Sequence, residues 1–360
     1  MPLKSYFCVF SKKEPLKAIL VKQAIMKIAT YLLDGAEQSA LIIEDRLYNL
    51  NEADARLPKT LTTMLNEWET LAPIAQTAAQ AIASGALQVA SVGLNEVALL
   101  APVPRPTSCR DGYAFRQHVF AARRNRGVEM IAEFDEYPIF YFTNHNAIQG
   151  PGNIDCMPDH FKNLDFELEI AAVIGKKGRN FTAAEADNYI AGYCIMNDMS
   201  ARVLQMEEMK LNLGPAKGKD FSTVIGPWLV TPDELEAYKV PAKNNHVGNT
   251  YNLKMTCSVN SVQVSEGNVA DMDWTFAEIV ERCGYGVDVY PGDVIGSGTV
   301  GTGCFLELNG TGKLNDPNYQ AQWLQDGDEV VMTIDGLGTL TNKIVKVDTD
   351  FSILALKKQA

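Results

Sequence analysis

Polar and apolar residues alternate in the stretch Asn163–Val173, which reads NLDFELEIAAV. This alternation predicts a β-strand in which Glu167 and Glu169, two positions apart, point to the same side. An isolated acidic strand of this kind usually has a solvated face. Here, however, the stretch continues into the uncharged residues AAVI, which indicates that the strand enters a core. Two buried carboxylates on one side need a cation to stay ionised, so the pattern predicts half of a metal site.

The patterns in the first hundred residues predict both strands and helices. The pattern of residues 26–50 predicts short strands in a hairpin-like array. Between Thr60 and Ser84, apolar residues recur at every third or fourth position, which predicts an amphipathic helix ending at Gly85. The stretch Leu94–Leu100 predicts a further strand.

Proline residues mark the clearest domain boundary. The segment Pro102–Pro106 reads PVPRP and predicts a stiff linker. We therefore expect a small N-terminal domain over residues 26–104 and a larger catalytic domain over residues 105–360. Residues 1–25 hold only short apolar pieces, and a clean strand pattern begins at Met26. We expect those first 25 residues to form a loosely ordered leader.

Beyond the linker, short strands with turn signals dominate the pattern. Thr182 and Glu185 form a capping-box sequence that predicts a helix ending near Gly192. A short strand over Tyr193–Met196 then leads to Asn197 and Asp198. Ser200–Met209 predicts another helix, and the chain beyond Tyr251 is rich in strands with Asp-Gly turns.

One glycine pattern imitates a nucleotide-binding motif. Gly296, Gly298 and Gly301 have the spacing of the dinucleotide-binding fingerprint, which requires a helix immediately afterwards. The following residues CFLEL, at positions 304–308, predict a strand instead. We therefore do not expect a dinucleotide site here.

Composition and charge exclude several classes of partner. With 32 basic and 44 acidic residues, the net charge is −12, which argues against nucleic acid or an anionic membrane as a partner. The seven cysteines are odd in number and never spaced C-x-x-C, which indicates reduced thiols and a cytoplasmic location. No apolar run in the sequence approaches the roughly 18 residues needed to span a bilayer.

The residues that could take part in catalysis or metal binding come in six blocks. In chain order, the blocks are RDGYAFRQH with Asp111 and His118, FELE with Glu167 and Glu169, MNDMSARxxQ with Asp198, KGKDFST with Lys219, GSGTVGTG with Thr299, and FLEL with Glu307. This succession resembles the fumarylacetoacetate hydrolase family, and is closest to its shorter bacterial-type members, from about Met26 to about Val345. The resemblance implies an α+β, β-rich fold, with a mixed β-roll catalytic domain after a small N-terminal α/β domain.

The resemblance also implies a role for each matching residue. The metal-binding carboxylates would be Asp111, Glu167, Glu169 and Asp198, with Lys219 and Thr223 close to the metal. The catalytic pair would be His118 and Glu307, assisted by Lys219. The substrate would be held by Tyr113, Tyr141, Arg202, Gln205 and Thr299.

Elementary chemistry supports these roles. Four converging carboxylates repel one another unless a hard divalent cation lies between them. Oxygen ligands without thiolate or imidazole favour Mg²⁺, with Ca²⁺ and Mn²⁺ as alternatives, and disfavour zinc. His118 has the side chain best suited to general-base catalysis near neutral pH. Glu307, if it accepts a hydrogen bond from the imidazole, would fix the tautomer.

Simpler interpretations of single residues stay open at this point. Lys219 could be a solvated lysine in a turn, Glu307 a charge on an edge strand, and Tyr113 and Tyr141 core residues. The basic run Arg123, Arg124 and Arg126 could include a ligand for a substrate carboxylate, although a solvated cluster is the simpler interpretation. The sequence does not choose among these three arginines.

Three functional hypotheses follow. The first is a metal-dependent hydrolase that cleaves a C–C bond in a 1,3-dicarbonyl acid, with fumarylacetoacetate from tyrosine breakdown as its substrate. The second keeps the site and changes the substrate, giving an acylpyruvate or fumarylpyruvate hydrolase or an oxaloacetate-type decarboxylase. The third is a catalytically idle homologue that binds a partner. In the first two, the partner is a small diketo acid, and the family resemblance implies a homodimer.

Overall fold

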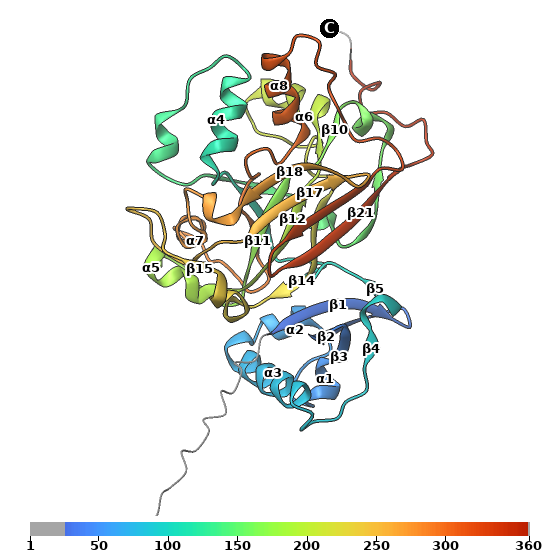
Figure 1. The fold of residues 1–360 in the computed structure, drawn as a ribbon, viewed down its shortest axis with the longest axis vertical. Helices are drawn as coiled ribbons and strands as arrows, with labels where there is room; N and C mark the ends of the chain where they lie inside the picture. The colour runs from blue at the N-terminus through green and yellow to red at the C-terminus, as the bar shows by residue number, and fades with distance from the viewer. Residues whose placement is uncertain (1–25, 359–360) are drawn as a thin grey trace, which may run out of the picture.

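The computed structural model describes residues 26–358, and its N-terminal part is a small lobe of strands and helices (Figure 1). The expectation of a loose leader over residues 1–25 therefore lies outside the described residues. The predicted array of short strands is confirmed, because three antiparallel strands follow one another here. The lobe contains β1 (Lys27–Leu33), β2 (Ala36–Ile43), β3 (Arg46–Asn49), α1 (Leu50–Ala53), α2 (Leu61–Leu65), α3 (Trp68–Ala83), β4 (Val92–Gly93) and β5 (Ala98–Leu99).

Two predictions for this lobe need correction. The single helix expected over Thr60–Ser84 is two helices, because α2 is capped at Asn66 and α3 starts anew at Trp68. Its predicted end is confirmed, since α3 stops just before Gly85, whose φ is +75°. The expected strand over Leu94–Leu100 is interrupted by a 3-10 turn over Leu94–Glu96, where the Glu96 carboxylate accepts the Gly93 N–H at 2.8 Å.

A large sheet continues from the N-terminal lobe into the rest of the chain. Strand β1 pairs with β14, with Lys27 opposite Val230 and Ile28 opposite Leu229. The path of the sheet is β4-β3-β2-β1-β14-β12-β11-β19-β6-β7. Its later strands are β6 (Cys109–Gly112), β7 (Phe140–Thr143), β8 (Ile148–Gln149), β11 (Leu168–Ile174), β12 (Ile190–Asp198), β14 (Thr223–Val230) and β19 (Val294–Gly296).

The strand predicted over Asn163–Val173 is confirmed for its second half. Strand β11 lies between β12 and β19, and all seven of its residues are buried. The first half is a separate short strand, β10 (Leu164–Asp165), which pairs with β13 (Ser200–Ala201). The strand pairing is interrupted between β10 and β11, where the Asp165 carboxylate accepts the N–H of the next residue, Phe166, at 3.0 Å. The Asp165 carboxylate also accepts the N–H groups of Phe305 and Leu306.

A second sheet packs against the first and closes the main hydrophobic core. Its strand order is β18-β17-β20-β21-β9, and an Asp335–Gly336 turn joins β20 to β21 as the pattern predicts. Buried residues of both sheets, such as Ile170 and Met332, belong to one core cluster. The remaining strands are β9 (Gly152–Cys156), β15 (Lys239–Val240), β16 (Thr250–Tyr251), β17 (Lys254–Val259), β18 (Val262–Asn268), β20 (Glu329–Ile334) and β21 (Gly338–Lys346).

Three helices gather at the end of the molecule opposite the N-terminal lobe (Figure 1). These are α4 (Arg116–Arg124), α6 (Arg202–Glu208) and α8 (Phe305–Asn315), while α5 (Ala183–Ala186) and α7 (Phe276–Cys283) lie elsewhere. The helix expected over Ser200–Met209 is confirmed except for its first residues, which form β13. The helix opened by the capping box is shorter than predicted, because β12 already begins at Ile190.

The strand predicted at CFLEL is wrong, because these residues begin helix α8. The cause lies far away in the sequence: the Asp165 carboxylate accepts the N–H groups of Phe305 at 2.8 Å and Leu306 at 2.9 Å. A carboxylate that satisfies the first N–H groups stabilises a helix start. It also takes the place that a phosphate would need, so the glycine fingerprint before α8 does not provide a dinucleotide site.

Candidate active site

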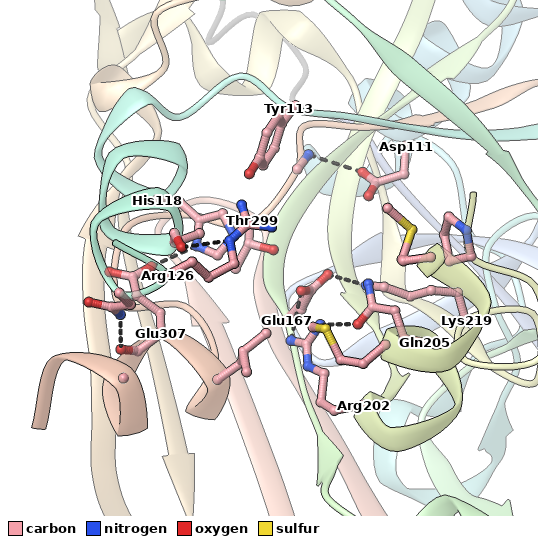
Figure 2. A pocket seen from close by; sticks show the side chains of 18 of the residues that line it. Asp111, Tyr113, His118, Arg126, Glu167, Arg202, Gln205, Lys219, Thr299 and Glu307 are labelled. Atoms are coloured by element: carbon pink, nitrogen blue, oxygen red, sulfur yellow. Dashed lines mark hydrogen bonds and ion pairs between the residues drawn. The ribbon is translucent and has the colours of Figure 1, made fainter. Parts of the chain in front are cut away.

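A cavity of about 690 Å³ lies where the three gathered helices meet the ends of the large sheet. Figure 2 shows its two kinds of surface. The floor, as we call it, consists of charged residues on strands and adjoining loops: Asp111, Glu167 and Lys219 line the cavity, and Glu169 and Asp198 complete the same cluster. The wall consists of the cavity-lining side chains outside the floor and outside the His118–Glu307 pair, among them Met206, Met209, Leu306, Ile139 and Arg126. Among the described residues, none of the N-terminal lobe lines this cavity.

The four carboxylates predicted to bind a metal lie together. Asp111, Glu167, Glu169 and Asp198 are all buried, and each offers an oxygen such that the four atoms lie within 4.8 Å of one another. They come from β6, from the break before β11, from β11 itself and from the end of β12. Strands of one sheet, with β19 between β11 and β6, therefore bring together residues that are up to 87 positions apart in the sequence.

One part of this cluster is neutralised by the chain's own cations. The Lys219 ammonium donates to Asp198 Oδ2 at 2.7 Å and also to Glu167. The Arg202 guanidinium donates to Glu167 Oε1 at 2.8 Å. Burial by itself raises the pKa of Glu167, but Lys219 and then Arg202 outweigh it and bring this pKa to about 2. Glu167 is thus ionised at any physiological pH.

The other part of the cluster has no such compensation. Burial and then the Asp198 carboxylate raise the pKa of Asp111 to about 7. Burial, Asp111 and Asp198 together raise the pKa of Glu169 well above its ordinary value. Within residues 26–358, Glu169 Oε2 and Asp198 Oδ1 are buried without a hydrogen-bond partner. Unpartnered carboxylate oxygens that repel one another fit a hard divalent cation, which prefers oxygen ligands.

The predicted His–Glu pair faces this cluster from the opposite side of the cavity, and a ring nitrogen of His118 lies within 4.8 Å of a Glu167 carboxylate oxygen (Figure 2). His118 Nδ1 is 2.6 Å from Glu307 Oε2, and Glu307 Oε1 accepts the Thr302 N–H at 3.0 Å. Because the carboxylate accepts from Nδ1–H, the other imidazole nitrogen, Nε2, carries a free lone pair. His118 lines the cavity and is 8% exposed, so this nitrogen is available to a bound molecule.

Close packing of α4 and α8 produces the pairing of His118 with Glu307. A Cβ on Gly310 of α8 would come within 2.5 Å of the Asn125 side chain at the end of α4. Asn125 uses this space to donate to the Glu307 backbone carbonyl at 3.1 Å. The glycine therefore leaves room for the two helices to pack closely enough for His118 to meet Glu307.

The residues predicted to hold the substrate divide into two groups. Tyr113, Tyr141, Arg202, Gln205 and Thr299 all line the cavity. Tyr113 stands edge-on to His118, with 6.0 Å between ring centroids, and its hydroxyl forms no hydrogen bond with another residue of the range 26–358. The others are engaged within the site: the Tyr141 hydroxyl donates to Asp198, and the Thr299 hydroxyl donates to Glu169 Oε1 at 3.3 Å.

Arg202 is the most heavily engaged of these residues. It donates to Asp165 and Glu167, each at 2.8 Å, and to Gln205 Oε1 at 2.9 Å. These bonds fix the position of Glu167 and leave little capacity to donate to a ligand. Gln205 lies three positions further along α6, on the same face, as the spacing predicts. Its amide nitrogen keeps both N–H groups for a bound molecule.

Thr223 lies behind the cluster and does not line the cavity. It stands opposite Asp198 in the register of β14 and β12, and its hydroxyl is 3.5 Å from that of Thr143. Its contribution in this structure is therefore to the packing around Asp198.

Of the three arginines that the sequence left undecided, only Arg126 lines the cavity. Its Nε donates to the Ala122 carbonyl at 3.0 Å, which leaves its two terminal nitrogens towards the space near His118 and Thr299 (Figure 2). Arg123 donates instead to the Glu129 carbonyl, and Arg124 donates to Thr311 of α8 at 2.7 Å.

The sequence analysis missed two residues of the site. Asp165 is fully buried, accepts from Arg202 and caps α8. Its signal was present, because it continues the alternation of Glu167 and Glu169 by one step towards the N-terminus. Asn125 fixes α8 against α4, but a lone asparagine in a basic run carries no such signal.

Comparison with known proteins identifies the family. Residues 107–345 match the family model described as "Fumarylacetoacetate (FAA) hydrolase C-terminal". The chain is 32% identical over 299 residues to the human "Oxaloacetate tautomerase FAHD2A, mitochondrial", covering 82% of this chain and 83% of that protein. The chain therefore belongs to the fumarylacetoacetate hydrolase family, and it is an enzyme of the class that includes hydrolases, isomerases and decarboxylases.

Two further similarities extend this result. The chain is 29% identical over 334 residues to "Oxaloacetate tautomerase YisK" of Bacillus subtilis (strain 168), covering 89% of this chain and all of that protein. Its fold matches a maleylpyruvate hydrolase from Sphingobium sp. SYK-6, solved with manganese(II) and pyruvate, with a TM-score of 0.63, 20% identity, and coverage of 89% of this chain and 99% of that one. The predicted α+β, β-rich fold of this family is thereby confirmed.

Proposed function

We propose that the chain is a divalent-metal-dependent hydrolase that cleaves a C–C bond in a 1,3-dicarbonyl acid. The observation that carries this proposal is the His118–Glu307 pair, whose free Nε2 faces a cavity that also contains the carboxylate cluster. A base with a free lone pair, oriented by a buried carboxylate, is the group needed to activate water. Fumarylacetoacetate, cleaved to fumarate and acetoacetate in tyrosine breakdown, is the first substrate to test.

The residues around the cavity support a simple sequence of events. His118 Nε2 removes a proton from water, and the resulting hydroxide attacks the carbonyl carbon at the end of the dicarbonyl unit. The C–C bond between that carbon and the central carbon then breaks, and its electron pair passes to the central carbon as an enolate. The proton held on His118 neutralises this carbanion, so atoms and charge balance. Glu307 stabilises the imidazolium in between.

The developing negative charge needs donors close by. Lys219 uses two of its three N–H groups on Glu167 and Asp198, so the third is available to an oxyanion. Gln205 has its amide N–H groups free, and Arg126 offers terminal nitrogens to a substrate carboxylate. When bound at Asp111, Glu167, Glu169 and Asp198, a divalent ion would supply Lewis-acid charge to the carbonyl oxygens. We propose Mg²⁺ for this site, with Mn²⁺ and Ca²⁺ as alternatives.

A second candidate function is the tautomerisation or decarboxylation of oxaloacetate. It is favoured by one observation, that the human and Bacillus relatives named as oxaloacetate tautomerases align with 83% or more of their own length. The chemistry is related, because an enolate forms in each case and a single base moves the proton. The two candidates differ in whether water is consumed.

A substrate panel tests these candidates. With Mg²⁺, we expect fumarylacetoacetate or an acylpyruvate to lose the diketone absorbance with release of two acids. Replacement of His118 by Ala should lower kcat by roughly 10²- to 10⁴-fold while leaving calorimetric Mg²⁺ binding intact. If the wild-type protein ignores every diketone but interconverts the keto and enol forms of oxaloacetate, the second candidate replaces the first.

We further propose that the enzyme acts as a homodimer in the cytoplasm, without nucleic-acid or membrane partners. The net charge of −12 supports the absence of a nucleic-acid partner. No helix among residues 26–358 is both long and apolar enough to cross a membrane. The six cysteines in this range are buried free thiols. Light scattering of the purified protein tests the dimer directly.

A further inference from the structure

The cavity is larger than a small diketo acid requires. Its volume is about 690 Å³, and the groups that handle the reacting carbonyls, the floor and the His118–Glu307 pair, face each other across it. A four-carbon acid extends over only three C–C bonds of about 1.5 Å each. Most of the wall would therefore face empty space in a complex with such a substrate.

Helical periodicity explains how this wall is built. On α8, Leu306, Gly310 and Lys313 line the cavity at intervals of four and three residues. On α6 and the turn that follows it, Met206 and Met209 do the same. Residues at this spacing form one stripe along a helix. With a rise of about 1.5 Å per residue, the seven steps from Arg202, which contacts Glu167 of the floor, to Met209 span about 10 Å along this stripe.

Much of the wall is apolar, whereas the floor is charged. The large apolar side chains that line the cavity are Met206, Met209, Leu306, Ile139, Pro215 and Trp323, beside the polar residues Asn125, Arg126, Asn309 and Lys313. Three of these large side chains are exposed to an unusual degree, with Met206 at 42%, Met209 at 44% and Ile139 at 49%. The acidic lining residues are Asp111 and Glu167 of the floor and Glu307, which is paired with His118. Apolar side chains that remain exposed around a concave site favour an apolar ligand group.

We propose that the substrate is a 1,3-dicarbonyl acid whose far carbonyl bears an apolar chain of about four or more carbons, and that this chain lies along Met206, Met209 and Leu306. This inference rests on the proposed function, because it assumes that the dicarbonyl end occupies the floor. It adds the substrate class, since neither oxaloacetate nor fumarylacetoacetate has an apolar chain. Methionine side chains adapt to different chain shapes, so we expect tolerance for the form of the chain and sensitivity to its length.

A series of acylpyruvates with acyl groups of two, four, six and eight carbons tests chain length. Each methylene that becomes buried should raise kcat/KM by about fourfold, so the hexanoyl compound should exceed the acetyl compound by well over tenfold. The Kd of the same compounds for the Mg²⁺-loaded His118→Ala protein should improve in parallel. Values of kcat/KM and Kd that are flat or that worsen with length overturn the inference. Improving Kd values without turnover by the wild type contradict the proposed hydrolysis alone.

Two variants locate the chain. Replacement of Met206 and Met209 together by Gln keeps side-chain length and removes apolar character. We expect the ratio of kcat/KM for octanoylpyruvate to that for acetylpyruvate to fall at least tenfold. The matched control is Leu211→Gln, because Leu211 belongs to the same segment and is 81% exposed but does not line the cavity. The inference fails if the control lowers this ratio as much as the double variant does.

Discussion

The floor and the wall of the cavity are built on opposite principles. The floor is a set of buried charges that strands and short loops fix, with Glu167 held by Arg202 and Lys219. The wall combines apolar side chains that remain partly exposed, such as Met206 and Met209, with polar ones such as Arg126. The difference teaches that the carboxylate cluster and the apolar lining can be changed separately. The four carboxylates lie on or beside the strands of the sheet, whereas the helices carry the His118–Glu307 pair and an apolar surface that can vary.

The largest effect should come from removing a carboxylate of the floor. Asp198→Ala removes an oxygen that has no hydrogen-bond partner in the described structure together with the one that accepts from Lys219. We expect turnover to disappear and the rise in Tm on adding Mg²⁺ to disappear with it, because ligand-linked stabilisation requires binding. The control is Asp271→Ala, an exposed aspartate outside the cavity. An Asp198→Ala protein with wild-type Mg²⁺ affinity would contradict the proposal that the floor binds the metal.

The next largest effect should come from the His118–Glu307 pair. Glu307→Gln keeps the shape of the side chain but has only one acceptor oxygen for the two donors, His118 Nδ1–H and the Thr302 N–H. We expect kcat to fall by roughly 10²-fold with KM little changed, because the stabilisation of the imidazolium is lost. Steady-state kinetics of the two proteins measure this. A variant that alters KM and spares kcat would indicate that Glu307 acts only in packing.

A pH experiment distinguishes the two parts of the floor. The folded pKa of Asp111 is about 7, whereas an unfolded aspartate has a pKa of about 3.9. The folded state thus keeps a proton that the unfolded chain has released between these values, and the free energy of unfolding falls as the pH rises through 7. Without metal, Tm should therefore decrease from pH 5 to pH 8, and the decrease should be shallower in Asp111→Asn. Equal slopes would contradict the raised pKa, and adding Mg²⁺ should reverse the decrease in the wild type alone.

The smallest effect should come from the wall. Arg126→Gln removes a charge that is exposed to solvent and offers nitrogens to the cavity, so we expect KM to rise by about tenfold with kcat nearly unchanged. Arg123→Gln is the matched control, since that side chain turns away to the Glu129 carbonyl. Equal KM values for the two variants would show that the basic run acts only through its overall charge.

The sequence was informative about the floor because local patterns encode it. The alternation around Glu167 and Glu169 predicts both their common side and their burial, whereas Asp111 and Asp198 were found through the resemblance of their blocks to the family. The spacing of Arg202 and Gln205 predicts their contact, which is present. What local patterns did not encode was that Arg202 would be occupied by Asp165 and Glu167.

The wall was harder to predict because its geometry depends on distant residues. Residues 304–308 have side chains typical of a strand, although they begin helix α8. The same helix contains Gly310 and Gly312, which disfavour helix formation. Helix α8 nevertheless forms because Asp165, 140 positions earlier than Phe305, caps it, and because Gly310 allows contact with Asn125. Neither cause is visible in the window of sequence around the helix. The same limit explains why the three arginines near His118 could not be ranked.

The pairing of β1 with β14 has a consequence for anyone who works with part of the chain. Strand β14 carries Thr223, directly beside Asp198, and at its other end it hydrogen-bonds to β1 through Lys27 and Ile28. Deleting the N-terminal lobe would leave this end of β14 as an open edge with unpaired backbone groups and an uncovered apolar face around Ile225 and Leu229. Such an edge invites association with other chains. A truncated catalytic fragment should therefore aggregate on expression, and the lobe serves as the protective border of the sheet on which the acidic residues stand.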